Sequence, residues 1–189
     1  MYILVIGDTH IPDRALSIPE KLLESIESGK PWDIAVFTGD FTDRDVLEWF
    51  KRLGRKTYYV RGNMDYLPLP KHQVFNINDL RIGVHHGDGV YPRGDPKGLT
   101  QIADSLSVNI LISGHTHVPF IKHGLREEIL LINPGSLTGV WGGGGGSMKP
   151  SMMIIELNDK ITIQHYELID TRLKVNKYTI RYMDNKWIF

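Results

Sequence analysis

The first sixty residues alternate between short apolar runs and amphipathic segments, and this alternation limits the fold more than any other feature. Residues 1–6, 34–37 and 58–60 are apolar runs of strand length, whereas the segments between them carry apolar side chains at helical spacing. Strands that alternate with helices are joined by right-handed crossovers into a parallel sheet. The sequence therefore predicts an α/β fold for the first half of the chain.

Local signals predict where the two helices of this half begin and end. Ser17-x-x-Glu20 has the spacing of a capping box and precedes apolar residues at helical intervals. Thr42 is placed to cap the second helix, and Gly54 is placed to end it.

The rest of the chain is rich in strands. Strand-like runs occupy residues 74–77, 80–84, 108–112, 120–122, 129–132, 152–157, 161–168 and 174–182. A third helix is predicted at residues 98–106, Asn158-Asp159 is typical of a hairpin turn, and the five glycines at 142–146 predict a mobile surface loop. Without an internal repeat or a domain boundary, we expect one domain over residues 1–189, built from two packed sheets.

Composition excludes several functional classes. The chain has 22 basic residues, 22 acidic residues and no cysteine. Zero formal net charge argues against a protein that coats nucleic acid or binds membrane surfaces through basic patches. The absence of cysteine excludes disulfides, thiolate zinc sites, iron–sulfur clusters and cysteine nucleophiles. No apolar run approaches the roughly 18 residues of a membrane span, and no leader precedes the first strand, so we expect a cytoplasmic protein.

Side chains that can ligate a metal follow several of the predicted strands, often next to a glycine. They are Asp8, His10, Asp40, Asn63, His86, His115 and His117. Because the carboxyl ends of the strands of an open α/β sheet lie along one edge, these residues can converge on one site. Carboxylates, an amide oxygen and imidazoles suit divalent Mn, Fe, Zn or Ni, and a bridging aspartate would reduce the repulsion between two neighbouring cations.

Each motif alone has an ordinary structural interpretation. A Gly-Asp pair after a strand is more often a turn or a helix cap, and His86 alone is more often a hydrogen-bonded histidine near the core. Gly114-His115-Thr116-His117 is more specific, because two histidines at positions i and i+2 beside a glycine seldom have such an explanation. The order of all the motifs together carries the functional prediction.

In that order the motifs resemble the calcineurin-like metallophosphoesterases. The matching segments are Gly7-Asp8-Thr9-His10, Gly39-Asp40, Gly62-Asn63-Met64-Asp65, His86-Gly87 and Gly114-His115-Thr116-His117. The resemblance implies a four-layer α/β/β/α sandwich with two mixed sheets flanked by helices. The short length is also similar to that of the small single-domain prokaryotic phosphodiesterases. Tyr91-Pro92-Arg93-Gly94-Asp95, Asn133-Pro134-Gly135-Ser136 and Pro150-Ser151 extend it to the phosphoesterase-like subunit of retromer.

The resemblance also implies a set of metal ligands and a reaction. One divalent ion would be held by Asp8, His10, Asp40 and His117, and a second by Asp40, Asn63, His86 and His115, with Asp40 bridging. Mn is the expected metal, with Ni, Fe, Zn or Mg as alternatives. The expected activity is hydrolysis of a phosphodiester by a hydroxide that bridges the two metals, with Asn63, Asp40 and His115 as the catalytic residues.

One departure from the family and two alternative functions bear on this prediction. Many relatives have a histidine where this chain has Met64, and a thioether cannot donate a proton to a leaving group. The resemblance to the retromer subunit leaves open a scaffold that binds metal and a protein partner, or a second copy of itself, with little or no catalysis. A phosphomonoesterase is the third hypothesis. All seven ligand positions carry residues that can ligate a metal, which favours an enzyme acting on a phosphate ester.

Other polar residues receive structural interpretations. Arg93, beside Gly94, is interpreted as a solvated loop arginine, with contact to a phosphate as the alternative. His85 either supports the ligands or points to the opposite face of its strand. The histidines without a motif, interpreted as surface or structural, are His72, His123 and His165.

Overall fold

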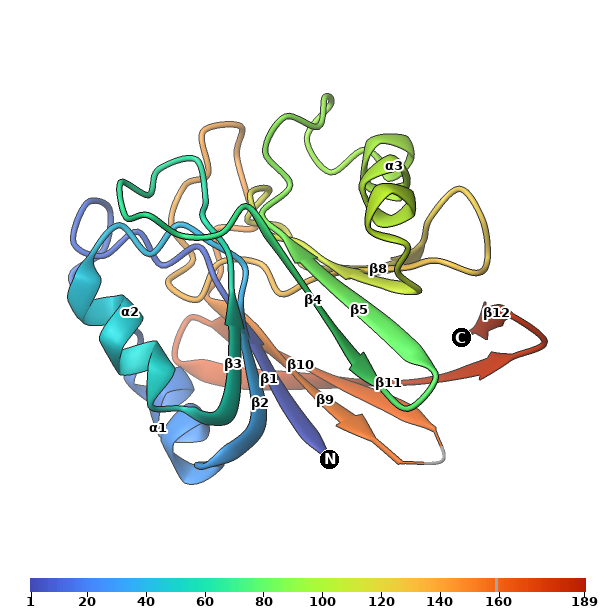
Figure 1. The fold of residues 1–189 in the computed structure, drawn as a ribbon. Helices are drawn as coiled ribbons and strands as arrows, with labels where there is room; N and C mark the ends of the chain where they lie inside the picture. The colour runs from blue at the N-terminus through green and yellow to red at the C-terminus, as the bar shows by residue number, and fades with distance from the viewer. Residues whose placement is uncertain (159) are drawn as a thin grey trace.

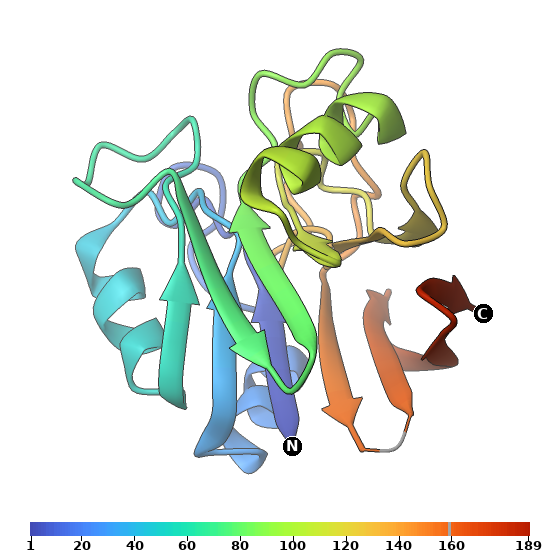
Figure 2. The same cartoon turned by 45° about the vertical axis from the view of Figure 1, so that its right-hand side comes forward.

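Two β-sheets pack face to face, and helices cover the outer face of each sheet (Figures 1 and 2). This computed structural model describes residues 1–158 and 160–189. The hairpin turn predicted at Asn158-Asp159 falls partly outside them, because Asp159 is not among the described residues. Within those two ranges, no helix is both long enough and apolar enough to cross a bilayer.

The larger sheet has seven strands in the order β12-β11-β10-β9-β1-β2-β3. Its members are β1 (Tyr2–Ile6), β2 (Trp32–Phe37), β3 (Gly54–Tyr59), β9 (Ser151–Leu157), β10 (Ile161–Ile169), β11 (Arg172–Met183) and β12 (Lys186–Ile188). Strands β1, β2 and β3 pair in parallel, whereas β9 to β12 join by antiparallel pairing. The sheet is therefore mixed, as expected.

The smaller sheet has five strands in the order β4-β5-β6-β8-β7. They are β4 (His72–Ile77), β5 (Leu80–His85), β6 (Ile110–Ile112), β7 (Phe120–His123) and β8 (Leu130–Asn133). The three central strands are parallel, and β4 and β7 are antiparallel edges. The helices are α1 (Glu20–Ser28), α2 (Arg44–Lys51) and α3 (Pro96–Leu106).

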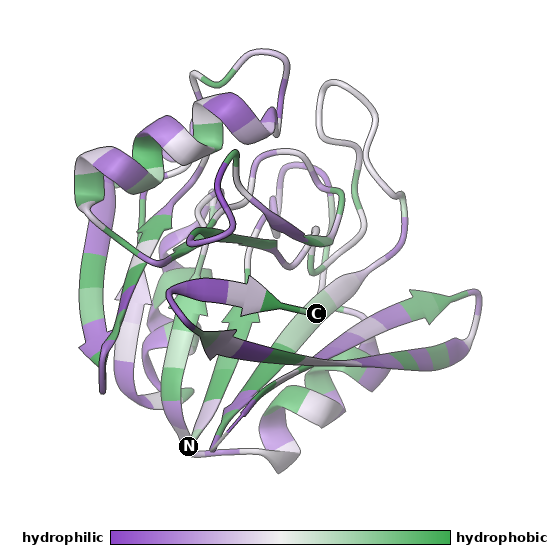
Figure 3. Cartoon of the chain, turned by 90° about the vertical axis from the view of Figure 1, so that its right-hand side faces the viewer, coloured by the Kyte–Doolittle hydropathy of each residue, from purple (hydrophilic) through white to green (hydrophobic). Residues whose placement is uncertain are grey.

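Alternation of side chains along the strands produces the layers. Ile3 and Val5 of β1 point into the core between the sheets, whereas Leu4 and Ile6 pack in the cluster under α1 and α2. On the other sheet, Leu111 of β6 packs in a third cluster beneath α3. The apolar residues lie along the strands, and the helices turn polar residues outward (Figure 3). Three apolar clusters between four layers confirm the predicted α/β/β/α sandwich.

The predicted helix ends require three corrections. The capping box at Ser17 is wrong: Pro19 is the N-cap of α1, has no side-chain oxygen, and no side chain caps this helix. Thr42 does not cap α2, because the Asp43 carboxylate does so by accepting from the N–H of Asp45 at 2.6 Å. Gly54 does not end α2 either, since it is the first residue of β3.

Strand β12 was not predicted from the sequence, and it brings Trp187 into the core. Its side chain is 2% exposed and belongs to the cluster between the sheets. The indole N–H donates to the carbonyls of Glu128 and Asn109, at 3.0 and 3.2 Å. The C-terminal strand therefore links the larger sheet to loops of the smaller one.

Candidate metal centre

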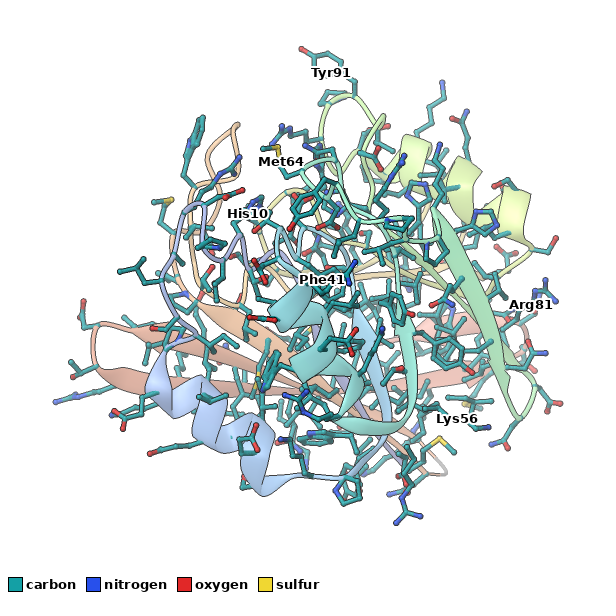
Figure 4. The ribbon with its side chains drawn as sticks, turned by 60° about the vertical axis from the view of Figure 1, so that its left-hand side comes forward. His10, Phe41, Lys56, Met64, Arg81 and Tyr91 are labelled. Atoms are coloured by element: carbon teal, nitrogen blue, oxygen red, sulfur yellow. The ribbon has the colours of Figure 1, made fainter. Side chains whose placement is uncertain are left out.

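All seven predicted ligands come together on loops that follow strands. Asp8 and His10 follow β1, Asp40 follows β2, Asn63 follows β3, His86 follows β5, and His115 and His117 follow β6. Figure 4 shows His10 and Met64 among these loops, with Tyr91 on a neighbouring loop. Both sheets contribute ligands, and α1, α2 and α3 contribute none of the seven.

Four of these residues form a tight buried cluster. One ligand atom from each of Asp8, His10, Asp40 and His117 lies within 4.8 Å of the others. Nε2 of His10 is 3.2 Å from Oδ2 of Asp40, and Nε2 of His117 is 3.4 Å from Oδ1 of Asp8. The two Nε2 atoms are only 3.1 Å apart.

The other three ligands adjoin this cluster through Asp40. Nε2 of His86 lies 3.4 Å from Oδ2 of Asp40, the same oxygen that faces His10. It is also 3.0 Å from Oδ1 of Asn63 and 3.3 Å from Nδ1 of His115. Asp40 is thus the residue shared by both groups of side chains.

The hydrogen bonds behind two of the rings fix their tautomers. Nδ1 of His117 lies 2.7 Å from the carbonyl oxygen of Val140, and Nδ1 of His86 lies 2.8 Å from that of Thr38. Each Nδ1 must therefore donate, so in the neutral ring Nε2 carries the lone pair that can ligate a metal. Because Nε2 of His86 faces the Asn63 amide oxygen, this contact requires either a proton on Nε2 or a metal ion between the two atoms. The donor set fits a divalent metal.

Electrostatics make the centre attractive to positive charge. Burial would lower the pKa of His86, but the hydrogen bond with Asp40 and the charges of Asp8 and Asp40 raise that pKa to about 9. His117 is buried too, yet Asp8 raises its pKa. Asp40 is desolvated, but its hydrogen bonds with His10 and His86 hold its pKa well below the usual range. The site therefore takes up protons or metal ions.

His115 is the exception among these rings. Burial, followed by the positive charges of His86 and Arg93, lowers the pKa of His115 to about 4. Its imidazole is consequently neutral near pH 7, which is the form that ligates a metal.

The backbone of the centre is strained at several ligands. Left-handed φ angles occur at Asp8 (50°), His10 (49°), Asp40 (60°), Thr42 (62°), His115 (69°) and His117 (56°). Such angles are uncommon outside glycine and cluster at functional sites, where surrounding contacts hold them in place.

Asp65 supplies one set of these contacts. Its carboxylate accepts hydrogen bonds from the backbone N–H groups of Gly62, Thr42 and Asp40, at 2.8, 2.8 and 2.9 Å. The backbone N–H of Met64 donates to Oδ1 of Asp40 at 2.8 Å. Gly62 has no room for a side chain, since a Cβ would lie 2.6 Å from Cγ of Asp40. The sequence placed Asp65 in a motif but did not indicate this role.

Residues 133–138 supply a second set of contacts. The side-chain amide of Asn133 donates to the carbonyl of Gly114 at 2.7 Å. Ser136 Oγ donates to the carbonyl of Asp8 at 2.7 Å, and Thr138 Oγ1 donates to that of Thr9 at 2.8 Å. This segment thus holds the loops of two candidate ligands, and in the sequence only the family resemblance had singled it out.

The remaining histidines lie outside the centre. Nδ1 of His85 accepts from the N–H of Gly87 at 2.9 Å, and the ring lines a groove beside α3 on the outer face of its sheet. His165 is buried on β10, and a ring nitrogen of His123 lies 2.8 Å from the carbonyl oxygen of Trp187. His72 is exposed on β4.

Two mixed sheets enclosed by helices, with a buried Asp and His cluster beyond the strand ends, define an α/β sandwich with a candidate metal centre. Residues 1–160 match the model of the calcineurin-like phosphoesterase superfamily domain. The chain belongs to this family, which confirms the family predicted from the motifs.

Curated relatives and solved structures agree with this membership. The chain is 46% identical over 138 residues to a probable metallophosphoesterase of Methanocaldococcus jannaschii (73% of this chain, 69% of the relative). It is 41% identical over 141 residues to a probable metallophosphoesterase of Methanothermobacter thermautotrophicus (73% of this chain, 78% of the relative). The crystal structure of Entamoeba histolytica Vps29 with Zn²⁺ is 32% identical, with a TM-score of 0.85 over 95% of this chain and 99% of that one.

Proposed function

We propose that this protein is a phosphodiesterase that depends on two divalent metal ions. The observation that carries the proposal is the gathering of seven ligand-type side chains around Asp40, whose Oδ2 lies 3.2 Å from Nε2 of His10 and 3.4 Å from Nε2 of His86. One ion would be held by Asp8, His10, Asp40 and His117, and the other by Asp40, Asn63, His86 and His115. Mn is the expected metal, with Ni, Fe, Zn or Mg as alternatives.

The chain's own groups support phosphodiester chemistry. A bound metal pair lowers the pKa of a water molecule and neutralises negative charge on the phosphate. Asn63 is exposed and turns its amide oxygen to His86, which leaves its NH₂ group to donate to a phosphate oxygen. The carbonyls of Thr38 and Val140 hold the rings of His86 and His117 in the ligating tautomer. No side-chain nucleophile is required.

Metal titration after chelation tests the number of ions. We expect saturation near two ions per chain by elemental analysis, with Mn the best activator. Saturation at one ion would contradict the two-metal proposal.

Asp40→Ala tests the shared ligand. Because Oδ2 of Asp40 faces both His10 and His86, the variant should lose affinity at both positions and lose more than roughly 100-fold in activity. Asp43→Ala is the matched control, since this carboxylate caps α2 outside the centre. Wild-type activity in Asp40→Ala would show that the shared role is wrong.

Paired chromogenic substrates test the ester class. Bis(p-nitrophenyl) phosphate should be hydrolysed in preference to p-nitrophenyl phosphate. The opposite preference would replace the proposal with a phosphomonoesterase.

The similarity to Vps29 along almost the whole chain supports a second candidate, a scaffold that binds metal and a protein partner with little catalysis. Binding of metal without hydrolysis of either ester, across Mn, Ni, Zn and Mg, would favour the scaffold.

A further inference from the structure

Two loops meet beside the metal centre and hold Arg93 there. Nη1 of Arg93 donates a hydrogen bond to the carbonyl of Gly142, the first residue of the glycine run. Gly142 in turn lies against a ligand ring, since a Cβ built on it would be 2.8 Å from Cγ of His117. Arg93 is therefore connected to the centre through one residue of backbone.

The loop that carries Arg93 is anchored on the other side as well. A Cβ on Gly94 would lie 2.9 Å from Cγ2 of Thr116, the residue between His115 and His117. The carbonyl of Gly94 accepts a hydrogen bond from Nζ of Lys122 at 3.0 Å. The guanidinium charge is felt at His115, where it helps to lower the pKa of that ring.

The glycine run is fitted to the arginine. A Cβ on Gly143 would lie 3.2 Å from Nη2 of Arg93, and one on Gly144 would lie 3.5 Å from its Cδ. The run closes on itself, because the Gly142 N–H donates to the carbonyl of Gly145 at 2.8 Å. After the run, the Ser147 N–H donates to the carbonyl of His117 at 3.0 Å. It therefore packs around Arg93, which the expectation of a simple surface loop did not include.

We infer that Arg93 binds a phosphate oxygen of the substrate at the metal centre. The side chain is exposed, and Gly142 is its one hydrogen-bond acceptor in residues 1–158 and 160–189, so its other N–H groups are free for a ligand. A planar guanidinium presents parallel N–H donors that match two oxygens of a phosphate. This inference deepens the proposed phosphodiesterase and rests on it.

Binding of inorganic phosphate to the Mn-loaded protein tests the role without turnover. Calorimetry should show roughly 10- to 100-fold weaker binding in Arg93→Ala, the loss expected for a charge-assisted hydrogen bond, and an intermediate loss in Arg93→Lys. Arg14→Ala is the matched control, since Arg14 donates to the carbonyl of Trp141 beside the same glycine run. Equal metal content in all variants shows that the centre is intact.

Two results would overturn the inference: unchanged phosphate affinity in Arg93→Ala, or an equal loss in Arg14→Ala. Diester kinetics separate this failure from failure of the proposed function. If the wild type hydrolyses diesters and Arg93→Ala keeps its KM and phosphate affinity, the arginine role alone is wrong. If no diester is hydrolysed but phosphate affinity still depends on Arg93, the phosphate site stands and the phosphodiesterase proposal fails.

Discussion

The rings of His86 and His117 are oriented from behind by main-chain carbonyls, and the Asp40 carboxylate accepts a hydrogen bond from the main-chain N–H of Met64. These contacts come from the backbone, so they persist when neighbouring side chains change. The geometry of the centre is therefore set before any ligand arrives, which reduces the cost of binding one.

Met64 contacts Asp40 through its backbone, so its side chain can be replaced without removing this contact. Its backbone N–H holds Asp40, and its side chain is 42% exposed beside the centre. Met64→His should keep the backbone bond and supply a proton donor near the leaving group. We expect rates on diesters with poor leaving groups to rise by up to roughly 10- to 100-fold, and rates with nitrophenolate to change little.

A series of diesters with graded leaving-group pKa checks this prediction. The plot of log rate against leaving-group pKa should become shallower in Met64→His and stay unchanged in Met64→Leu, which has no donor. Parallel lines for all three proteins at equal metal content would show that Met64 is not near the leaving group or that another acid already acts.

His165 gives a prediction about pH. It is 8% exposed on β10, and burial lowers its pKa, so the native state keeps it neutral. As pH falls below the ordinary histidine value of about 6.5, the unfolded chain takes up a proton that the native chain resists. The free energy of unfolding should therefore fall with acid, and His165→Leu should reduce that fall.

Urea denaturation of the chelated proteins between pH 7.5 and pH 5 measures this difference, because the other histidines are common to both chains and cancel. The same pH slope in both proteins would exclude His165 as a source of acid sensitivity.

The candidate ligands could be picked out from the sequence because their residue types and their places after strands are local properties. The hydrogen bonds that hold the loops of these residues in place could not be predicted in this way. Ser136 bonds to Asp8 across 128 positions of sequence, and Asp65 acts on backbone groups of Asp40 and Thr42 that carry no residue-specific signal.

At the scale of elements, the length of an apolar pattern decided what was predictable. Most strands were expected near their observed positions, because they carry consecutive or alternating apolar residues. Strand β3 is one exception: it begins at Gly54 with polar residues, four positions before the expected start. Strand β12 has three residues, too few for any periodicity, and the helix caps depended on which of several neighbouring polar residues reached a free N–H.

Trp187 should make β12 important for stability despite its length. Trp187→Ala removes a fully packed ring and two hydrogen bonds, so we expect a loss of about 3–5 kcal/mol in the free energy of unfolding. Ile188→Ala, on the same strand but 50% exposed, should change it by less than about 0.5 kcal/mol. Urea denaturation of the metal-loaded proteins measures both, and similar values for the two variants would contradict a core role for β12.

At the scale of the molecule, the centre lies where the two sheets meet. The larger sheet supplies Asp8, His10, Asp40 and Asn63, and the smaller one supplies His86, His115 and His117. A bound ion would thus be a link between the sheets, in addition to the apolar core.

Chelation should therefore lower the melting temperature without unfolding the protein, because the three apolar clusters remain. Adding Mn back should restore the melting temperature in a concentration-dependent manner. Binding at one site adds about 2.7 kcal/mol to the free energy of unfolding when the free metal is 100 times its Kd. Calorimetric melting curves at graded Mn concentration test this. A melting temperature that does not respond to chelator or metal would argue against metal binding in the folded state.

None of the seven candidate ligands comes from a helix, and this division separates the outer surface of the fold from the candidate centre. Substitutions on the outward faces of α1, α2 and α3 change the exposed surface of the molecule. The seven side chains after the strands are unaffected by them. The outer surface of the fold can therefore vary under selection while the side chains of the candidate metal centre stay the same.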